Sequence, residues 1–235
     1  MKTLEICSGE NASFSSVARG LGFETLTLDC NPRCGADVCE DIRTWDYKAF
    51  PHDYFAVVWA SPPCDQMSIC NSSKPGLETA DEVSKKILEI CAYFNAYAFV
   101  ENPYSALPRR PHMSEFKDFL RVVNYCTYSE DGDVFPYAKK TAVYDLKQSP
   151  WTPRPLCDRR CAFCENGVHV SWARHGPTQA QRMQCDRLGI PHTFTTAELH
   201  RVPKALCREI LQSLTRADAQ SETIRFVNPE NSISS

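Results

Sequence analysis

The sequence lacks any hydrophobic run long enough to cross a membrane. Hydrophobic side chains make up 43% of its 235 residues, but no stretch approaches the roughly 20 apolar residues of a membrane span. A single lysine and then a strand-like segment stand at the N-terminus, so we expect no secretory signal. These absences predict a soluble, intracellular protein of the cytoplasm or nucleus, with one sizeable core and no membrane partner.

Evidence for a disulfide framework is also lacking. The chain has 13 cysteines, an odd number, and without a secretory signal this argues for a reduced, intracellular protein. Most of the thiols should be ordinary core residues. Those in apolar patterns are Cys7, Cys91, Cys126 and Cys207.

The formal net charge is only −3, but it is unevenly distributed. Residues 1–103 carry 8 basic and 15 acidic side chains, a net −7, whereas residues 104–202 carry 14 and 10, a net +4. A basic middle segment suggests contact with a polyanion. The alternative is an ordinary solvated surface, and charge alone does not separate the two.

The first half of the chain alternates apolar strands with amphipathic helices. Strands are expected at residues 3–7, 23–28, 54–60 and 97–100, and helices at 13–21 and from about residue 79. This rhythm predicts an α/β fold: a doubly wound, mostly parallel sheet with helices on both faces.

Later helices are marked by their ends. Thr178 should cap a helix that Gly189 ends, and Pro203 should open another. From about Thr215 the chain is polar and is expected to be frayed.

Four candidate functional residues follow predicted strands: Gly9, Asp29, Cys64 and Glu101. Because ligands sit at the carboxyl ends of parallel strands, these positions should share one rim. Gly9 permits close approach of a ligand to the backbone. Asp29 follows it by 20 residues, a spacing suited to an acid that binds ribose hydroxyls.

Pro62 and Pro63 stiffen the loop that presents Cys64. A free cysteine has a pKa near ~8.5, so a nucleophilic role requires activation by the surroundings or by substrate. Glu101, which follows a second apolar run, is a candidate acid beside this thiol. The alternative is a buried free thiol and a helix-capping glutamate.

Together these segments resemble the cytosine-5 methyltransferases, closest to the compact type of phages and large DNA viruses, over roughly residues 3–214. The resemblance implies S-adenosylmethionine as cofactor and DNA as partner. It implies that Cys64 attacks a flipped cytosine with help from Glu101 and Asn102. Two alternatives remain: the same reaction on transfer RNA, and a non-catalytic nucleic-acid-binding protein on a degenerate scaffold.

The resemblance also implies the cofactor contacts, with Asp29 at the ribose and Asp41 at the adenine. The full set is Glu5, Ser8, Gly9, Asn11, Asp29, Cys30, Asp41, Ile42, Pro62 and Val202. The chain departs from the family pattern at Asn11, where a second glycine is usual. The family's basic motif after the acid has its nearest match in Lys139-Lys140.

A cysteine cluster in the middle segment has the spacing of a metal site. Cys157, Cys161 and Cys164, with His169 or His175, would hold zinc tetrahedrally. The alternative is a reduced, loop-borne cluster without metal.

We expect three parts in the chain. The catalytic domain should comprise residues 1–128 plus 178–214. Residues 129–177 should form a small recognition insert that faces this domain across a basic cleft, and residues 215–235 a flexible tail.

Overall fold

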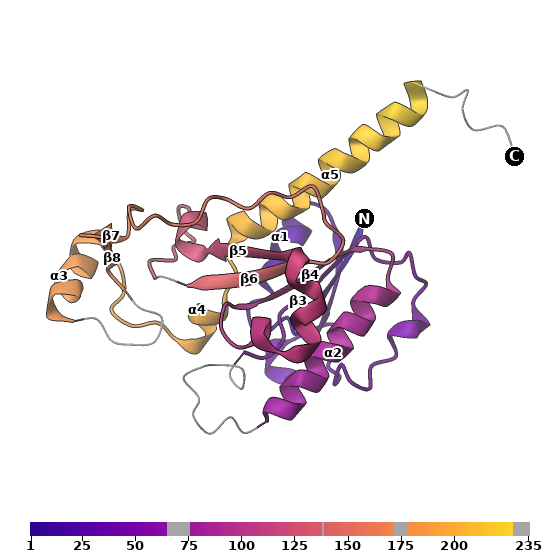
Figure 1. The fold of residues 1–235 in the computed structure, drawn as a ribbon, viewed down its shortest axis with the longest axis horizontal. Helices are drawn as coiled ribbons and strands as arrows, with labels where there is room; N and C mark the ends of the chain where they lie inside the picture. Colours follow the sequence, from indigo (N-terminus) through magenta and orange to yellow (C-terminus); the bar gives the residue numbers. More distant parts are fainter. Residues whose placement is uncertain (65–75, 138, 172–177, 228–235) are drawn as a thin grey trace, which may run out of the picture.

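The computed structural model describes residues 1–64, 76–137, 139–171 and 178–227. At its centre is a six-stranded sheet with the order β2-β1-β3-β4-β6-β5 (Figure 1). The strands are β1 (Lys2–Ile6), β2 (Glu24–Leu28), β3 (Val57–Ala60), β4 (Tyr97–Pro103), β5 (Leu120–Asn124) and β6 (Lys140–Asp145). The first four are parallel, and β6 runs antiparallel to β4 and β5. The predicted mostly parallel α/β sheet is confirmed.

Helices cover both faces of this sheet. On one face lie α1 (Ser13–Gly20) and α5 (Lys204–Val227), and on the other lies α2 (Leu77–Tyr93), whereas α3 (Gln179–Leu188) lies apart from the sheet (Figure 1). Successive strand residues face opposite sides, so Trp59 stacks on Phe14 of α1 with ring centroids 5.1 Å apart. Its neighbours Val58 and Ala60 pack in the cluster that contains Ile87 of α2. Burial on both faces explains why the strands read as continuous apolar runs.

The ends of the later helices follow their capping residues. Thr178 and Gln181 form a capping box at the start of α3, and Gly189 ends that helix with a φ of 64°. Helix α5 begins after Pro203 as predicted, but it continues to Val227. The run from Thr215 to Val227 contains neither glycine nor proline to break the helix. The expectation of a frayed tail from about Thr215 stays a prediction.

Pairing with β6 lengthens β4 beyond its predicted end. Glu101 lies opposite Val143, and Asn102 lies opposite Ala142. Glu101 is therefore within the strand rather than just past it. β6 falls in the range predicted as an insert, residues 129–177, yet it is a strand of the central sheet.

A smaller part of the molecule lies beyond one end of the sheet, at the left of Figure 1. It contains the hairpin β7 (Cys164–Glu165) and β8 (Val168–His169), together with α3. The short helix α4 (Thr196–His200) lies between α3 and α5 in the sequence. The 3-10 helices are η1 (Pro32–Cys34), η2 (Tyr47–Ala49), η3 (Leu107–Arg109), η4 (Pro111–Phe119) and η5 (Tyr125–Tyr128). Across the described ranges, no helix is long and apolar enough to cross a membrane.

Helix α5 belongs to the core beside α1, and Ile210 on its buried face is fully inaccessible to solvent. Ile210→Ala should lower the free energy of unfolding by about 2–5 kcal/mol, because it removes buried methyl and methylene groups. Urea unfolding followed by circular dichroism measures the change. Arg216 is exposed on the same helix, and Arg216→Ala should change stability by less than about 0.5 kcal/mol. Equal stability of the two variants would contradict this packing.

Candidate active site

A cavity of about 420 Å³ lies at the carboxyl end of the parallel strands. The strand order reverses between β1 and β3, and this is the point at which such sheets bind ligands. The predicted site residues that line it are Glu5, Ser8, Gly9, Asn11, Asp29, Pro62, Cys64, Glu101, Asn102 and Val202. The structure thus brings the predicted nucleophile, the predicted acid and most of the predicted cofactor contacts into one space.

Asp29 is held in place by two backbone donors. The Gly9 N–H donates to Asp29 Oδ2 at 2.9 Å, and the Asn31 N–H donates to Oδ1 at 2.9 Å. Gly9 adopts a φ of 60°, a left-handed conformation that glycine accepts without steric cost. The loop after β1 and the end of β2 are therefore locked together at the cavity wall.

Glu5 holds the start of α1, the helix that follows the same loop. Its buried carboxylate accepts hydrogen bonds from the N–H groups of Phe14 at 3.3 Å and Ser15 at 2.8 Å, and so caps α1. Burial raises the pKa of Glu5 to about 7, although these hydrogen bonds oppose the shift. Glu5 thus sets where α1 begins.

Residues 196–202, which include α4, form another part of the cavity wall. Asn11 Nδ2 donates to the Ala197 carbonyl at 2.8 Å, and the Val202 N–H donates to Ser13 Oγ at 3.2 Å. Asn11, the departure from the expected glycine, therefore ties the loop after β1 to α4. The cavity wall from α4 consists of Thr196, Ala197 and His200. No local motif in the sequence marks these three residues.

The loop that carries Cys64 is fastened to β4. Asn102 Nδ2 donates to the Pro62 carbonyl at 2.9 Å. Glu101 is 5% exposed, and it accepts a hydrogen bond from the Tyr125 hydroxyl at 2.7 Å. Cys64 and Glu101 therefore both sit on fixed supports in the same cavity.

Of the basic pair noted in the sequence, only Lys139 lines the cavity. Its Nζ donates to the Leu199 carbonyl at 2.7 Å and lies 4.6 Å from the centre of the Tyr125 ring. Burial lowers the pKa of Lys139, while attraction to Glu101 and Cys64 acts in the opposite direction. The cavity thus has a cation close to the predicted nucleophile and acid.

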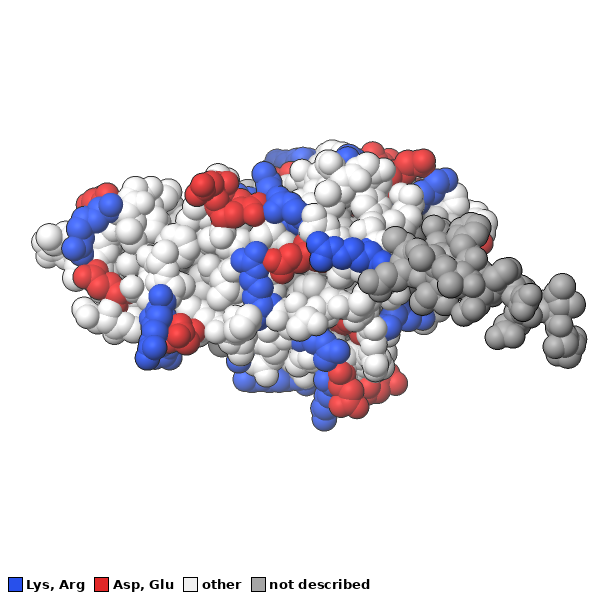
Figure 2. Space-filling view, turned by 90° about the horizontal axis from the view of Figure 1, so that it is seen from above, with Lys and Arg blue, Asp and Glu red and all other residues white. Residues whose placement is uncertain are grey.

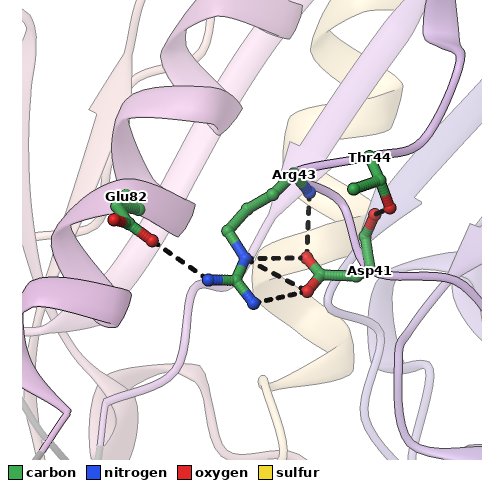
Figure 3. Close-up of polar contacts among 4 residues, drawn as sticks. All are labelled: Asp41, Arg43, Thr44 and Glu82. Carbon is green, nitrogen blue, oxygen red and sulfur yellow. Dashed lines mark hydrogen bonds and ion pairs between the residues drawn. The ribbon is translucent and has the colours of Figure 1, made fainter.

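Three predicted cofactor contacts, Cys30, Asp41 and Ile42, do not line the cavity. Cys30 is exposed and Ile42 is buried in the core. Asp41 is engaged by Arg43, whose guanidinium bridges it to Glu82 (Figure 3). Hydrogen bonds from Arg43 lower the pKa of the Asp41 carboxyl. An adenine contact at Asp41 stays a prediction.

The candidate metal ligands meet at a separate place. One ligand atom from each of Cys126, Cys157, Cys161 and His169 lies within 4.8 Å of the other three. Cys164 is not in this set, but its sulfur lies 3.5 Å from that of Cys161. Cys126 is buried, as expected of a core residue, and its sulfur also lies 3.3 Å from His169 Nε2. His175 lies outside the described residues.

Basic and acidic side chains alternate over the face in Figure 2 rather than gathering in one patch. Several arginines of residues 104–202, the segment with net positive charge, form ion pairs with carboxylates. They are Arg110, Arg154, Arg160, Arg187 and Arg201. Part of the positive charge counted in the sequence is therefore neutralised locally, and the predicted basic cleft stays a prediction.

Comparison with known proteins relates the chain to methyltransferases. It is 28% identical over 228 residues to the "Probable DNA (cytosine-5)-methyltransferase" of Frog virus 3 (isolate Goorha), across 90% of this chain and 99% of the viral protein. No protein-family model matches the chain.

Two solved structures are also similar. One is a SAM-dependent methyltransferase from Archaeoglobus fulgidus, at 15% identity over 60% of this chain and 84% of that one, with a TM-score of 0.38. The other is a DNMT2 triple mutant from Spodoptera frugiperda, at 14% identity over 94% of this chain and 80% of that one, with a TM-score of 0.44. Both TM-scores are below 0.5, so the fold assignment depends on the sheet topology itself.

The match to the viral protein over nearly all of both chains identifies this protein as a methyltransferase. It confirms the resemblance to the cytosine-5 methyltransferases of large DNA viruses that the sequence motifs predict.

The raised pKa of Glu5 predicts a pH dependence of stability. Because the shift is upward, from 4.5 to about 7, the contribution of the neutral acid is complete below pH 4.5 and is lost as the pH rises through 7. The loss should be on the order of 3 kcal/mol, since one pKa unit is worth about 1.4 kcal/mol.

The matched variant is Glu5→Gln, which keeps an oxygen acceptor for α1 but does not titrate. Urea unfolding of both proteins between pH 4 and 8 should show the stability of the wild type falling relative to the variant as the pH rises. A constant difference across this range would show that Glu5 does not titrate there.

Proposed function

We propose that this protein transfers a methyl group from S-adenosylmethionine to carbon 5 of cytosine in DNA. The observation that supports this most strongly is that one cavity is lined by Gly9 and Asp29 as well as by Cys64 and Glu101. Methyl transfer to a base requires the cofactor and the activated ring to be held next to each other. The name of the viral relative points to the same substrate.

The cavity fits a polar cofactor. Among the residues described, Ser8 Oγ and Asn102 Oδ1 are buried without a hydrogen-bond partner, and both residues line the cavity. Buried polar groups without partners are costly, so a polar ligand there is favoured. Each Asp29 oxygen accepts one backbone hydrogen bond and keeps further acceptor capacity for ribose hydroxyls.

The residues around Cys64 suit covalent activation of a pyrimidine. The Cys64 sulfur forms a bond to ring carbon 6, and the electron pair of the ring double bond moves toward carbon 5. Glu101 hydrogen-bonds the ring nitrogen and supplies a proton to it, held in position by the Tyr125 hydroxyl. Lys139 lines the same cavity, and in its protonated form its ammonium is attracted to the thiolate that attacks the ring.

S-adenosylmethionine supplies the methyl group that carbon 5 accepts. Transfer of the carbon 5 proton to water then restores the ring double bond and expels the Cys64 thiolate, and the ring nitrogen returns its proton to Glu101. A cytosine within a duplex must leave the base stack to reach these residues.

Cofactor binding should depend on Asp29. Asp29→Ala should weaken S-adenosylmethionine binding by about 1.5–3 kcal/mol, the usual worth of hydrogen bonds to a charged acceptor. Isothermal titration calorimetry measures this affinity. Glu24 is exposed near the start of the same strand, so Glu24→Ala should bind as the wild type does. Equal affinity in the wild type and the Asp29 variant would show that the cofactor binds elsewhere.

The nucleophile is tested by trapping. DNA that contains 5-fluorocytosine should form an adduct that survives denaturing electrophoresis and requires the cofactor, because fluorine replaces the proton that must leave carbon 5. Cys64→Ser should abolish the adduct, since a hydroxyl is far less ionised than a thiol.

Cys34 is the matched control because it lines the same cavity. Burial and the nearby Asp29 raise its pKa to about 11, which leaves little thiolate near neutral pH. Cys34→Ser should still be trapped. An adduct that persists without Cys64 but vanishes without Cys34 would overturn the assignment.

Parallel traps separate the proposed substrate from the alternatives. Transfer RNA that contains 5-fluorocytosine should give less adduct than the DNA. More adduct with transfer RNA than with DNA would show that RNA is the substrate of the same reaction. If neither nucleic acid is trapped although the cofactor binds, a non-catalytic protein on this scaffold is favoured instead.

A further inference from the structure

The cluster of thiols and imidazole at the edge of η5 has the dimensions of a zinc site. His169 Nε2 lies 3.3 Å from the sulfur of Cys126, 3.5 Å from that of Cys161 and 3.8 Å from that of Cys157. Zn–S bonds of about 2.3 Å and Zn–N bonds of about 2.0–2.1 Å place the ligands of a regular tetrahedron about 3.5–3.8 Å apart. The nitrogen–sulfur separations of 3.3–3.8 Å are close to that figure, and all four ligand atoms lie within 4.8 Å of one another.

The contacts within the cluster give His169 Nε2 no strong hydrogen-bond partner. His169 is only 6% exposed, and its Nε2 faces three sulfurs. Thiols are weak hydrogen-bond donors and acceptors, and a buried polar group without good partners is costly. A metal ion bound by Nε2 and the sulfurs would remove that cost.

The neighbouring hydrophobic cluster is too small to hold this part of the fold alone. It contains three buried residues, Val170, Cys185 and Ile190. Small modules with so little core generally need disulfides or a metal. The cysteines that the structure describes are all free thiols, which leaves a metal as the available cross-link.

The backbone around the cluster is arranged for ligation. The Cys157 N–H donates to Asn124 Oδ1 at 3.1 Å, and the N–H groups of Arg159 and Cys161 donate to the Cys157 sulfur. Arg159 has a φ of 66°, a left-handed turn that brings the chain back toward that sulfur. These contacts hold the Cys157 sulfur in position, as hydrogen bonds around metal ligands do.

We propose that Cys126, Cys157, Cys161 and His169 bind one zinc ion, and that this ion fastens residues 157–169 to the central domain. Cys126 is the ligand from the central domain, because η5 directly follows β5. Its neighbour in the chain, Tyr125, donates to Glu101. Through Tyr125 the ion would also help to keep Glu101 in position. That role depends on the proposed methyltransferase function, whereas zinc binding itself does not.

Metal analysis tests the site without any activity assay. Freshly purified, reduced protein should contain about one zinc per chain, and Cys126→Ser should lose it. Cys91 is equally buried but lies in the cluster around α2, so Cys91→Ser should keep its zinc. A metal-free wild type, or full zinc content in the Cys126 variant, would overturn the proposal.

Cobalt substitution keeps the proposal testable if Cys126→Ser fails to fold. Co²⁺ added to chelator-treated wild-type protein should bind at about one equivalent, with the thiolate charge-transfer and tetrahedral d–d absorption of a three-sulfur, one-nitrogen site. Cys164→Ser should leave these bands unchanged, whereas His169→Asn should change them. If Cys164→Ser changes the bands and His169→Asn does not, Cys164 rather than His169 is the fourth ligand. If the wild type shows no such bands, the site is excluded.

Discussion

Pairing of β1 with both β2 and β3 is the constraint on which the rest of the structure depends. It reverses the direction in which strands are added to the sheet, and so it opens a crevice at the carboxyl ends of the strands. The segments that follow β1, β2 and β3 supply Gly9, Asp29 and Cys64 to this crevice. The predicted cofactor loop and the predicted nucleophile loop, which are distant in sequence, thereby face the same space.

Antiparallel pairing of β6 with β4 completes the site. It extends β4 through Glu101 and Asn102, so the two predicted catalytic side chains stand on a strand rather than on a loop. Rigid elements hold reacting groups more accurately than loops do. The position of β6 also places Lys139, which directly precedes it, beside Glu101 and Cys64.

Local sequence was enough to predict the sheet and much of the cavity. Apolar runs marked the strands, and Gly9, Asp29 and Cys64 were found because each follows such a run. Contacts between distant segments were not predictable in this way. Cys126 stands in an apolar pattern, and the residues proposed to bind metal with it come 31 to 43 residues later. The cavity wall from α4 has no motif of its own, and no local signal showed that Asp41 pairs with Arg43, which also pairs with Glu82.

The account's central claim is that Cys64 and its cavity methylate cytosine in DNA. The most direct test is sequencing that reports 5-methylcytosine in DNA from cells that express the wild type or Cys64→Ser, in a host without its own cytosine methylation. The account predicts methylated cytosines in a recurring sequence context with the wild type, and none above background with the variant. Unmethylated DNA from cells that contain folded wild-type protein would contradict it.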